Sequence, residues 1–236
     1  MAEYLTNTTD LTKVASAIRE KVGTSGALVY PDGFVSAINA IATGSGSDDV
    51  LHKLLTRTIS GEYSSDREIS IGKYAFAECI YLTGVSFPQA EIISDSAFYN
   101  CLRITHIDFP KAKRIERSGL RGLNSLTRFA LPNMETLETY SFFQDKALTT
   151  ADFHKVLEIG SYAFTSCSAL VTLIIRSSAV ARLVNENAFN STPIKNGTGY
   201  IYVPSDLVDG YKAATNWATY ANQIRAIEDY PDITGV

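Results

Sequence analysis

The chain has 236 residues, of which 45% are hydrophobic and 19% charged, and a formal net charge of −4. This composition is typical of a folded globular chain and excludes a disordered one, and its slight acidity argues against nucleic-acid binding, which needs a basic face. No apolar run reaches the ~18 residues of a membrane span, so we expect no membrane insertion. The first residues lack the basic and apolar regions of a signal peptide. Three cysteines do not suggest a disulfide scaffold.

Residues 1–44 are predicted to form a small helical N-terminal module. Apolar residues recur at helical spacing over residues 11–22 and again over residues 34–42. Two helices of this size bury too little apolar surface to be stable alone, so the module either caps the solenoid described below or attaches the protein elsewhere, including by self-association. Residues 45–49, rich in glycine and serine, are predicted to be a flexible linker, which favours attachment.

Residues 50–204 are predicted to form a solenoid, because residues 71–180 repeat regularly every 22 residues and residues 181–204 form an elongated sixth unit. Three buried columns are expected: Phe76, Phe98, Leu120, Phe142 and Phe164; Phe87, Phe109, Leu131, Phe153 and Ile175; and Cys79, Cys101, Leu123, Asp145 and Cys167. We expect the cysteines to be inert buried thiols. Asp145 is expected to mark an open or rearranged turn.

Each repeat unit has two parts with different hydrophobic periods. The Leu-x-x-Ile-x-Phe-Pro part alternates apolar and polar residues, which predicts a short strand ended by proline. The Ile-x-x-x-Ala-Phe-x-x-Cys part has apolar residues three and four apart, which predicts a helical turn or short helix. A unit of this size cannot fold alone, so neighbouring units must stack around one continuous core.

The repeat resembles a known family. Residues 71–82 (IGKYAFAECIYL) and 159–170 (IGSYAFTSCSAL) are similar to the BspA-like leucine-rich repeat of bacterial surface proteins, and the resemblance covers about residues 69–204. It implies an α/β fold: a right-handed leucine-rich-repeat solenoid with parallel strands on the concave face and short helical turns on the convex face. It also implies a non-enzymatic role in adhesion to a protein or carbohydrate surface.

A second resemblance concerns the N-terminal module. Residues 11–21 and 30–38 resemble the leading segment of structural, often tail-associated, proteins encoded by prophages of gut bacteria. This resemblance implies a phage-encoded accessory structural protein. The alternative is a bacterial cell-surface adhesin that acts in host colonisation. The location therefore stays open between the virion and the extracellular or cell-surface space.

Residues 205–236 are predicted to be a helical C-terminal cap and tail. Ser205 suits a helix N-cap, and apolar residues recur on one face of the segment that follows. A terminal repeat must hide its apolar edge, so we expect this segment to cover the last strand. Trp217 is expected to belong to the core rather than to stack on a ligand.

The sequence contains no motif of an enzyme. His52, His106 and His154 do not have metal-ligand spacing, and no nucleophile-elbow, P-loop or dinucleotide-binding motif occurs. We therefore expect no catalytic residue, no metal site and no cofactor.

The outward positions of the predicted strands form the candidate binding surface. Two columns should face outward: Gly84, His106, Arg128, Thr150 and Thr172; and Ser86, Asp108, Ala130, Asp152 and Ile174. One interpretation is purely structural. The functional one is a polar strip for protein or glycan recognition that comprises His106, Asp108, Arg128, Thr150 and Asp152. Asp108 and Asp152 should lie about 10 Å apart, near the separation of an inverting glycosidase pair, although nothing in the sequence suggests a pocket.

Overall fold

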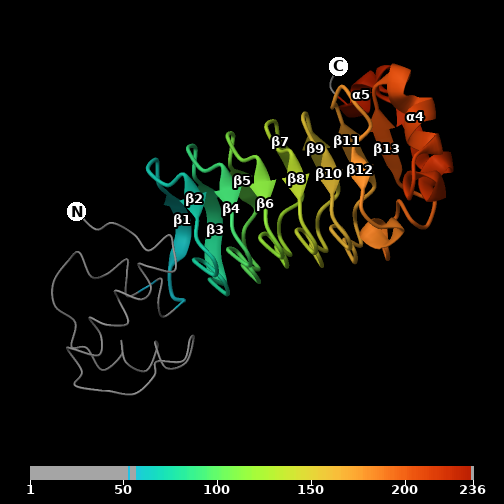
Figure 1. Cartoon of the computed structure of the whole chain (residues 1–236). Helices are drawn as coiled ribbons and strands as arrows, with labels where there is room; N and C mark the ends of the chain where they lie inside the picture. The colour runs from blue at the N-terminus through green and yellow to red at the C-terminus, as the bar shows by residue number, and fades with distance from the viewer. Residues whose placement is uncertain (1–52, 54–56, 235–236) are drawn as a thin grey trace, which may run out of the picture.

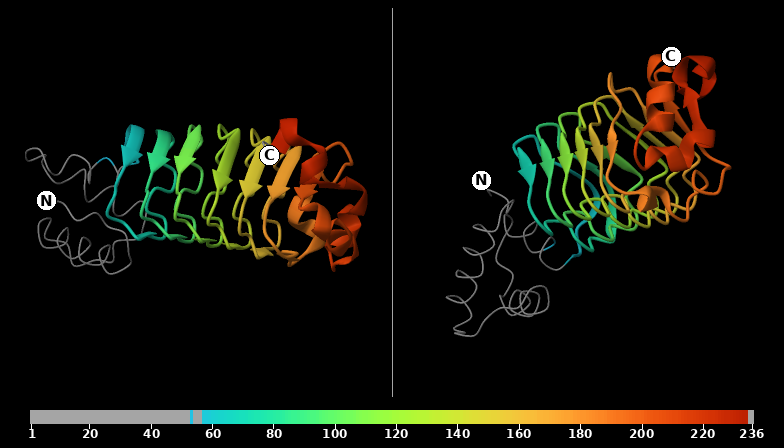
Figure 2. Two further views of the ribbon diagram at one scale, coloured as in Figure 1. Left: turned by 90° about the horizontal axis from the view of Figure 1, so that it is seen from above. Right: turned by 45° about the vertical axis from the view of Figure 1, so that its right-hand side comes forward.

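The computed structural model describes residue 53 and residues 57–234, and these form a solenoid of parallel strands that ends in a group of short helices (Figures 1 and 2). The predicted module of residues 1–44 and the linker of residues 45–49 lie outside the described residues. No helix in the described part of the chain is both long and apolar enough to span a bilayer.

Each unit contributes one longer strand and one strand of two residues, as alternation of apolar and polar residues predicts for the first of these. The longer strands are β1 (Ser60–Ser64), β3 (Tyr81–Ser86), β5 (His106–Asp108), β7 (Arg128–Leu131), β9 (Thr150–Phe153), β11 (Thr172–Ile175) and β13 (Tyr200–Val203). The short strands are β2 (Ser70–Ile71), β4 (Ile92–Ile93), β6 (Arg114–Ile115), β8 (Thr136–Leu137), β10 (Glu158–Ile159) and β12 (Arg182–Leu183).

The register of the strands follows the repeat. Parallel pairing joins residues at equivalent repeat positions, such as Gly84 with His106 and Arg128 with Thr150. The short strands form one continuous six-stranded sheet from β2 to β12. The longer strands fall into two sheets, one containing β1, β3 and β5 and the other β7, β9, β11, β13 and β14 (Ile224–Ala226). The predicted solenoid with parallel strands is confirmed.

The helical turns expected after each short strand are replaced by consecutive turns in the first five units. Each of these units has two left-handed residues four positions apart, for example Tyr74 (φ 57°) and Glu78 (φ 60°), a conformation that a right-handed helix excludes. Some turn N–H groups bond to the next unit instead of along the chain: Phe76 N–H donates to Ala97 C=O at 2.8 Å. Stacking thus supplies acceptors that a helix would find within itself. The sixth unit differs, with the 3₁₀ helix η1 (Glu186–Phe189).

The core is a ladder of stacked rings that runs along the solenoid. Phe142 and Phe164 lie 5.2 Å apart with an interplanar angle of 2°, and Phe189 continues the stack 5.6 Å from Phe164. Cys79, Cys101 and Cys167 are buried beside it, as predicted, and burial raises the pKa of each thiol, to about 11 for Cys79. Such thiols are poor nucleophiles because little thiolate forms at neutral pH.

Asp145 occupies the cysteine column without disturbing its turn, so the expected rearrangement is wrong. Its side chain is fully buried, and its carboxylate oxygen Oδ1 accepts a hydrogen bond from Leu123 N–H at 2.8 Å. The turn keeps the bond of its neighbours, here from Gln144 N–H to Thr165 C=O at 3.0 Å. The carboxyl group fits because it is compact and finds a backbone donor, while burial raises its pKa well above the ordinary value.

The layer of longer strands is interrupted between β5 and β7, an interruption that we call the seam. Elsewhere, the residue just before or at the start of a strand donates to the preceding unit: Thr105 N–H to Thr83 C=O at 2.9 Å and Thr149 N–H to Thr127 C=O at 2.7 Å. Among the described residues, the equivalent N–H of Thr127 has no acceptor. The strands on the two sides of the seam are therefore not joined at their beginnings.

The ends of the same two strands are also unjoined. Phe87 N–H donates to Asp108 C=O at 2.9 Å, but within the described part of the chain the equivalent N–H of Phe109 has no acceptor. The other layers stay continuous here, because β4 pairs with β6 and Phe98 N–H donates to Gly119 C=O at 2.9 Å. The seam therefore affects only one face of the solenoid.

We attribute the seam to an exchange of bulky side chains in the third unit. Leucines 120 and 131 replace phenylalanine in both aromatic columns, whereas Phe129 takes a strand position that holds Ile107 and Ala151 in the two neighbouring units. The Phe129 ring stacks on Phe142 at 4.6 Å, towards the fourth unit. Ile107, on the other side of the seam, is only half-buried, although Val85 at the equivalent position is 1% exposed.

This arrangement predicts a local difference in amide hydrogen exchange. The amides of Thr127 and Phe109 should exchange at least tenfold faster than those of Thr149 and Phe87, because only the latter two are hydrogen-bonded in the folded state. Residue-resolved NMR exchange measures all four amides in one sample. Equal protection of the two pairs would contradict the seam.

The C-terminal segment covers the last unit. It comprises η2 (Ser205–Leu207), α4 (Val208–Ala213), η3 (Trp217–Gln223), β14, η4 (Ile227–Asp229) and α5 (Pro231–Thr234). Trp217 is fully buried, lies 6.0 Å from Phe189 between ring centroids, and donates through Nε1 to Ala181 C=O at 2.6 Å. The predicted core role of Trp217 is confirmed.

Candidate functional site

The outward side chains of the longer strands form one continuous surface, which we call the strand face. Strand pairing places Gly84, His106 and their repeat equivalents in one column and Ser86, Asp108 and theirs in a second. Side chains alternate between the two faces of a strand, so both columns point away from the core. All five residues of the predicted strip therefore lie on one face, with the seam between His106 and Arg128.

His106 lies beside a gap in its own column. The neighbouring position is Gly84, where a β-carbon would collide with the imidazole ring. His106 Nε2 is 3.8 Å from Glu62 Oε1, and both side chains are more than half exposed. An exposed pair at this separation contributes little to stability. Because Gly84 has no side chain, the imidazole ring of His106 can lie over β3 and reach towards Glu62 on β1.

Asp108 is held by a hydroxyl from the adjacent strand. Ser86 Oγ donates to Asp108 Oδ2 at 2.6 Å, and the carboxylate remains exposed. The bond is short because its acceptor is charged. The second carboxylate oxygen, Oδ1, can still accept from another donor. Asp108 therefore keeps binding capacity on the side of the seam that β5 forms.

Asp152 is already neutralised by a residue that the strip prediction left out. Arg176 donates to both of its oxygens, through Nε at 3.0 and 3.2 Å and through Nη2 at 2.8 Å, in a bidentate arrangement. His154 Nε2 lies a further 3.7 Å from Asp152 Oδ1. Proline follows the strand at the equivalent position in the first three units, and His154 and Arg176 replace it in the fourth and fifth. This replacement is the feature of the sequence that could have identified the two partners of Asp152.

Arg128 and Thr150 lie side by side across β7 and β9. Arg128 is exposed, and among the described residues its guanidinium has neither a hydrogen bond nor an ion pair. Ala130, two residues further along β7, is also exposed and lies between Asp108 and Asp152 in the second column. The centre of the strand face thus presents the guanidinium of Arg128, which has no partner among the described residues, next to the small side chain of Ala130.

The strip does not assemble the groups of a hydrolase. Asp108 and Asp152 are bound to separate partners on different strands, so they do not form a convergent acid–base pair. Within the part of the chain that the structure describes, no group of three or more histidine, cysteine, aspartate or glutamate side chains could hold a metal ion.

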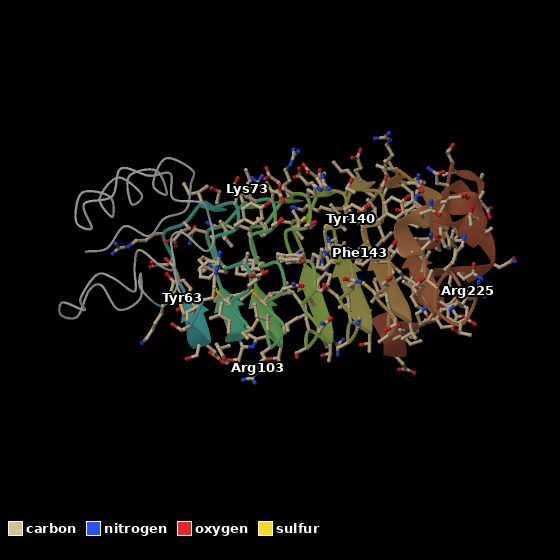
Figure 3. The ribbon with its side chains drawn as sticks, turned by 90° about the horizontal axis from the view of Figure 1, so that it is seen from below. Tyr63, Lys73, Arg103, Tyr140, Phe143 and Arg225 are labelled. Atoms are coloured by element: carbon tan, nitrogen blue, oxygen red, sulfur yellow. The ribbon has the colours of Figure 1, made fainter. Side chains whose placement is uncertain are left out.

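An aromatic cluster at the C-terminal end of the strand face was missed by the sequence prediction. Arg225 lies with its Cζ 4.8 Å from the ring centroid of Tyr200, and Tyr202 contacts Tyr230 edge-to-face at 5.3 Å. Burial raises the pKa of the Tyr202 hydroxyl. Figure 3 shows Arg225 at the capped end of the solenoid, far from Tyr63 at the other end. The pairing of β11 with β13 carries the outward columns into this cluster, a continuation that the insertion in the sixth unit concealed.

Comparisons with known proteins bear on the repeat region. The family model described as "BspA type Leucine rich repeat region" matches six copies, over residues 63–171 and 91–206. A leucine-rich repeat protein of known crystal structure from Bacteroides ovatus matches with 16% identity and a TM-score of 0.46, over 62% of this chain. The match spans only 40% of that protein. No curated protein sequence matches the chain.

The family match begins at residue 63, so nothing in it supports the prophage resemblance of residues 1–44. It extends over more than half of the chain and includes every strand of the strand face from β3 to β13. The chain therefore belongs to the BspA-type leucine-rich repeat family.

Proposed function

We propose that the protein is a non-enzymatic recognition module that binds a partner protein through the strand face, in an adhesive role. Family membership supports a role in protein interaction or adhesion. The observation that carries the proposal is the uncommitted, exposed guanidinium of Arg128 at the centre of a surface whose other charges have partners. Arginine is enriched at protein interfaces and at the residues that dominate their binding energy.

The geometry of the strand face also favours a macromolecular partner. Strands in a sheet are spaced about 4.8 Å apart, so the row from β1 to β13 presents an extended surface, as solenoid faces commonly do. At one end of this surface the half-buried Tyr200 and Arg225 add residue types typical of binding hot spots, and they pack beside the buried Tyr202. A glycan is the competing ligand, because a partly exposed ring such as that of Tyr200 can also stack on a sugar.

Combined substitution of Arg128→Ala and Asp108→Ala tests the proposal. Arrays of matrix proteins and glycans probed with the purified wild-type protein identify a ligand, and we expect the double variant to bind it at least tenfold more weakly. The melting temperature should stay within about 2 °C of the wild-type value, because both side chains are exposed.

A matched control replaces a second pair of opposite charges away from the strand face. Arg182 Nη1 donates to Glu158 Oε2 at 2.7 Å on the sheet of short strands, so Arg182→Ala with Glu158→Ala removes the same charges. Binding of the array ligand should survive this control. Equal binding by the Arg128/Asp108 double variant and the wild type would exclude the strand face as the site.

A further inference from the structure

The seam gathers hydrogen-bond donors that have no acceptor within the described residues. They are the backbone N–H groups of Thr127 and Phe109 and the guanidinium of Arg128. A backbone N–H that is buried without a partner costs free energy, as at Phe109, which is 2% exposed, whereas Thr127 is exposed and its N–H is accessible to a ligand. The N–H groups of Thr127 and Phe109 lie at opposite ends of the same pair of strands. Arg128, whose guanidinium has no partner among the described residues, follows Thr127 directly in the sequence.

The two backbone donors are separated by the length of a short extended peptide. Thr127 corresponds to Thr105 in the repeat, and Phe109 lies four residues beyond Thr105. Strands rise about 3.3 Å per residue, so the donors are about 13 Å apart along the strand direction. One ligand that accepts from both must be elongated and must carry acceptors at intervals, as an extended polypeptide backbone does.

The charges around the seam select the side chains of such a ligand. Asp152 is satisfied by Arg176, and Asp108 accepts from Ser86, which leaves Arg128 as the charge without a partner among the described residues of the strip. A carboxylate can accept two parallel bonds from a guanidinium. The ammonium or guanidinium groups of a basic ligand would instead meet the hydrogen-bond donors of Arg128, Thr127 and Phe109 and would be repelled by the charge of Arg128. The half-buried Ile107 side chain adds an apolar contact at the seam.

We propose that the seam between β5 and β7 binds an extended, acidic segment of a partner polypeptide. A carboxylate of that segment binds Arg128, and its backbone carbonyls accept from Thr127 N–H and Phe109 N–H. The proposal rests on the proposed function, since it names the chemistry of the partner and the place on the strand face where that partner binds.

Two short fluorescein-labelled peptides test the charge preference by fluorescence anisotropy. One alternates valine with glutamate and the other valine with lysine. We expect the full-length protein to bind the glutamate peptide and not the lysine peptide. Arg128→Gln should weaken glutamate-peptide binding at least tenfold, because a charged bidentate contact is lost. Arg103→Gln is the control, since Arg103 is exposed in the turn before β5 and lies over the Tyr81 ring.

The outcomes are distinct. Equal loss of binding in the Arg128 and Arg103 variants would reduce the effect to net charge and overturn the site, and so would absence of glutamate-peptide binding. If an array ligand is nevertheless lost in the Arg128/Asp108 double variant, the strand face stands as the binding surface and only the acidic-segment proposal fails. If array binding is also unaffected, both fail.

A second variant tests the seam without touching Arg128. Leu120→Phe, Phe129→Ile and Leu131→Phe together give the third unit the side chains that the second unit has at Phe98, Ile107 and Phe109, and should let β5 pair with β7. We expect slower exchange of the Thr127 and Phe109 amides and at least a tenfold loss of glutamate-peptide binding. Slower exchange with unchanged peptide binding would overturn the role of the backbone donors. Circular dichroism checks folding, and if the triple variant does not fold, the Arg128→Gln comparison decides alone.

Discussion

Replacing Phe142 by alanine is expected to lower the free energy of unfolding by about 4 kcal/mol, and the melting temperature by about 12 °C. The Phe142 ring is fully buried and lies between Phe129 at 4.6 Å and Phe164 at 5.2 Å. Its removal leaves a cavity in the middle of the ladder that neighbouring units, fixed by their backbone hydrogen bonds, cannot close. Thermal and urea denaturation followed by circular dichroism measure the loss.

The chain contains its own control for this experiment, because the next residue is also a phenylalanine. Phe143 is half-buried on the turn side, where it contacts Tyr140 edge-to-face at 5.2 Å and lies 4.7 Å from the guanidinium carbon of Arg121. Phe143→Ala should cost only about 1 kcal/mol. If both substitutions destabilise the protein equally, the internal ladder is not the main source of stability.

Replacing Asp145 by asparagine is expected to stabilise the protein at neutral pH, by about 2 kcal/mol, or about 6 °C in melting temperature. Desolvation raises the pKa of the buried carboxyl group well above its usual value. In the same column, the thiols of Cys101 and Cys167 donate to the carbonyls of Phe76 and Phe142 at 2.9 Å. An asparagine amide can donate to the equivalent carbonyl of Leu120 while its oxygen keeps the Leu123 N–H bond.

The pH dependence of stability separates this explanation from a simple packing effect. A group whose folded pKa is raised contributes stability that is fully present below its unfolded pKa, near 3.8, and is lost as pH rises through the folded pKa. The advantage of Asp145→Asn should therefore grow from about pH 4 upwards and vanish in acid. Urea denaturation at several pH values gives the curve. A constant difference at every pH would mean that ionisation of Asp145 is not responsible.

Much of the fold could be predicted because each repeat position has one environment. The columns of phenylalanine and cysteine identify the buried positions, and alternation around Asp108 and Arg128 identifies the outward ones. Local spacing could not predict the turns, because apolar residues three and four apart suit a helix equally well. What decides against the helix is a set of bonds to the next unit, such as that from Tyr74 N–H to Asp95 C=O at 3.1 Å, and these exist only after stacking.

The site shows the same division. The residues of the strip follow from the register, but their partners depend on side-chain geometry across strands, so the Arg176–Asp152 pair was not foreseen. The seam has a visible origin in Leu120, Phe129 and Leu131. Its effect on strand pairing depends on how the displaced ring packs against Phe142, which periodicity does not encode.

The 3₁₀ helix η1 gives the sixth unit a turn that suits the end of the solenoid. In the first five units, turn donors need acceptors from a following unit, and the fifth still uses Ala188 C=O to receive Phe164 N–H at 2.9 Å. In the sixth unit one of these donors is satisfied within its own turn: Tyr140 N–H donates to Ser161 C=O of the next unit at 3.2 Å, whereas the equivalent Asn187 N–H donates to Asn185 Oδ1 at 2.8 Å. Duplication of an internal unit could therefore lengthen the protein, because each added turn would find its carbonyl acceptors in the unit that follows it. The same sixth unit would still end the solenoid.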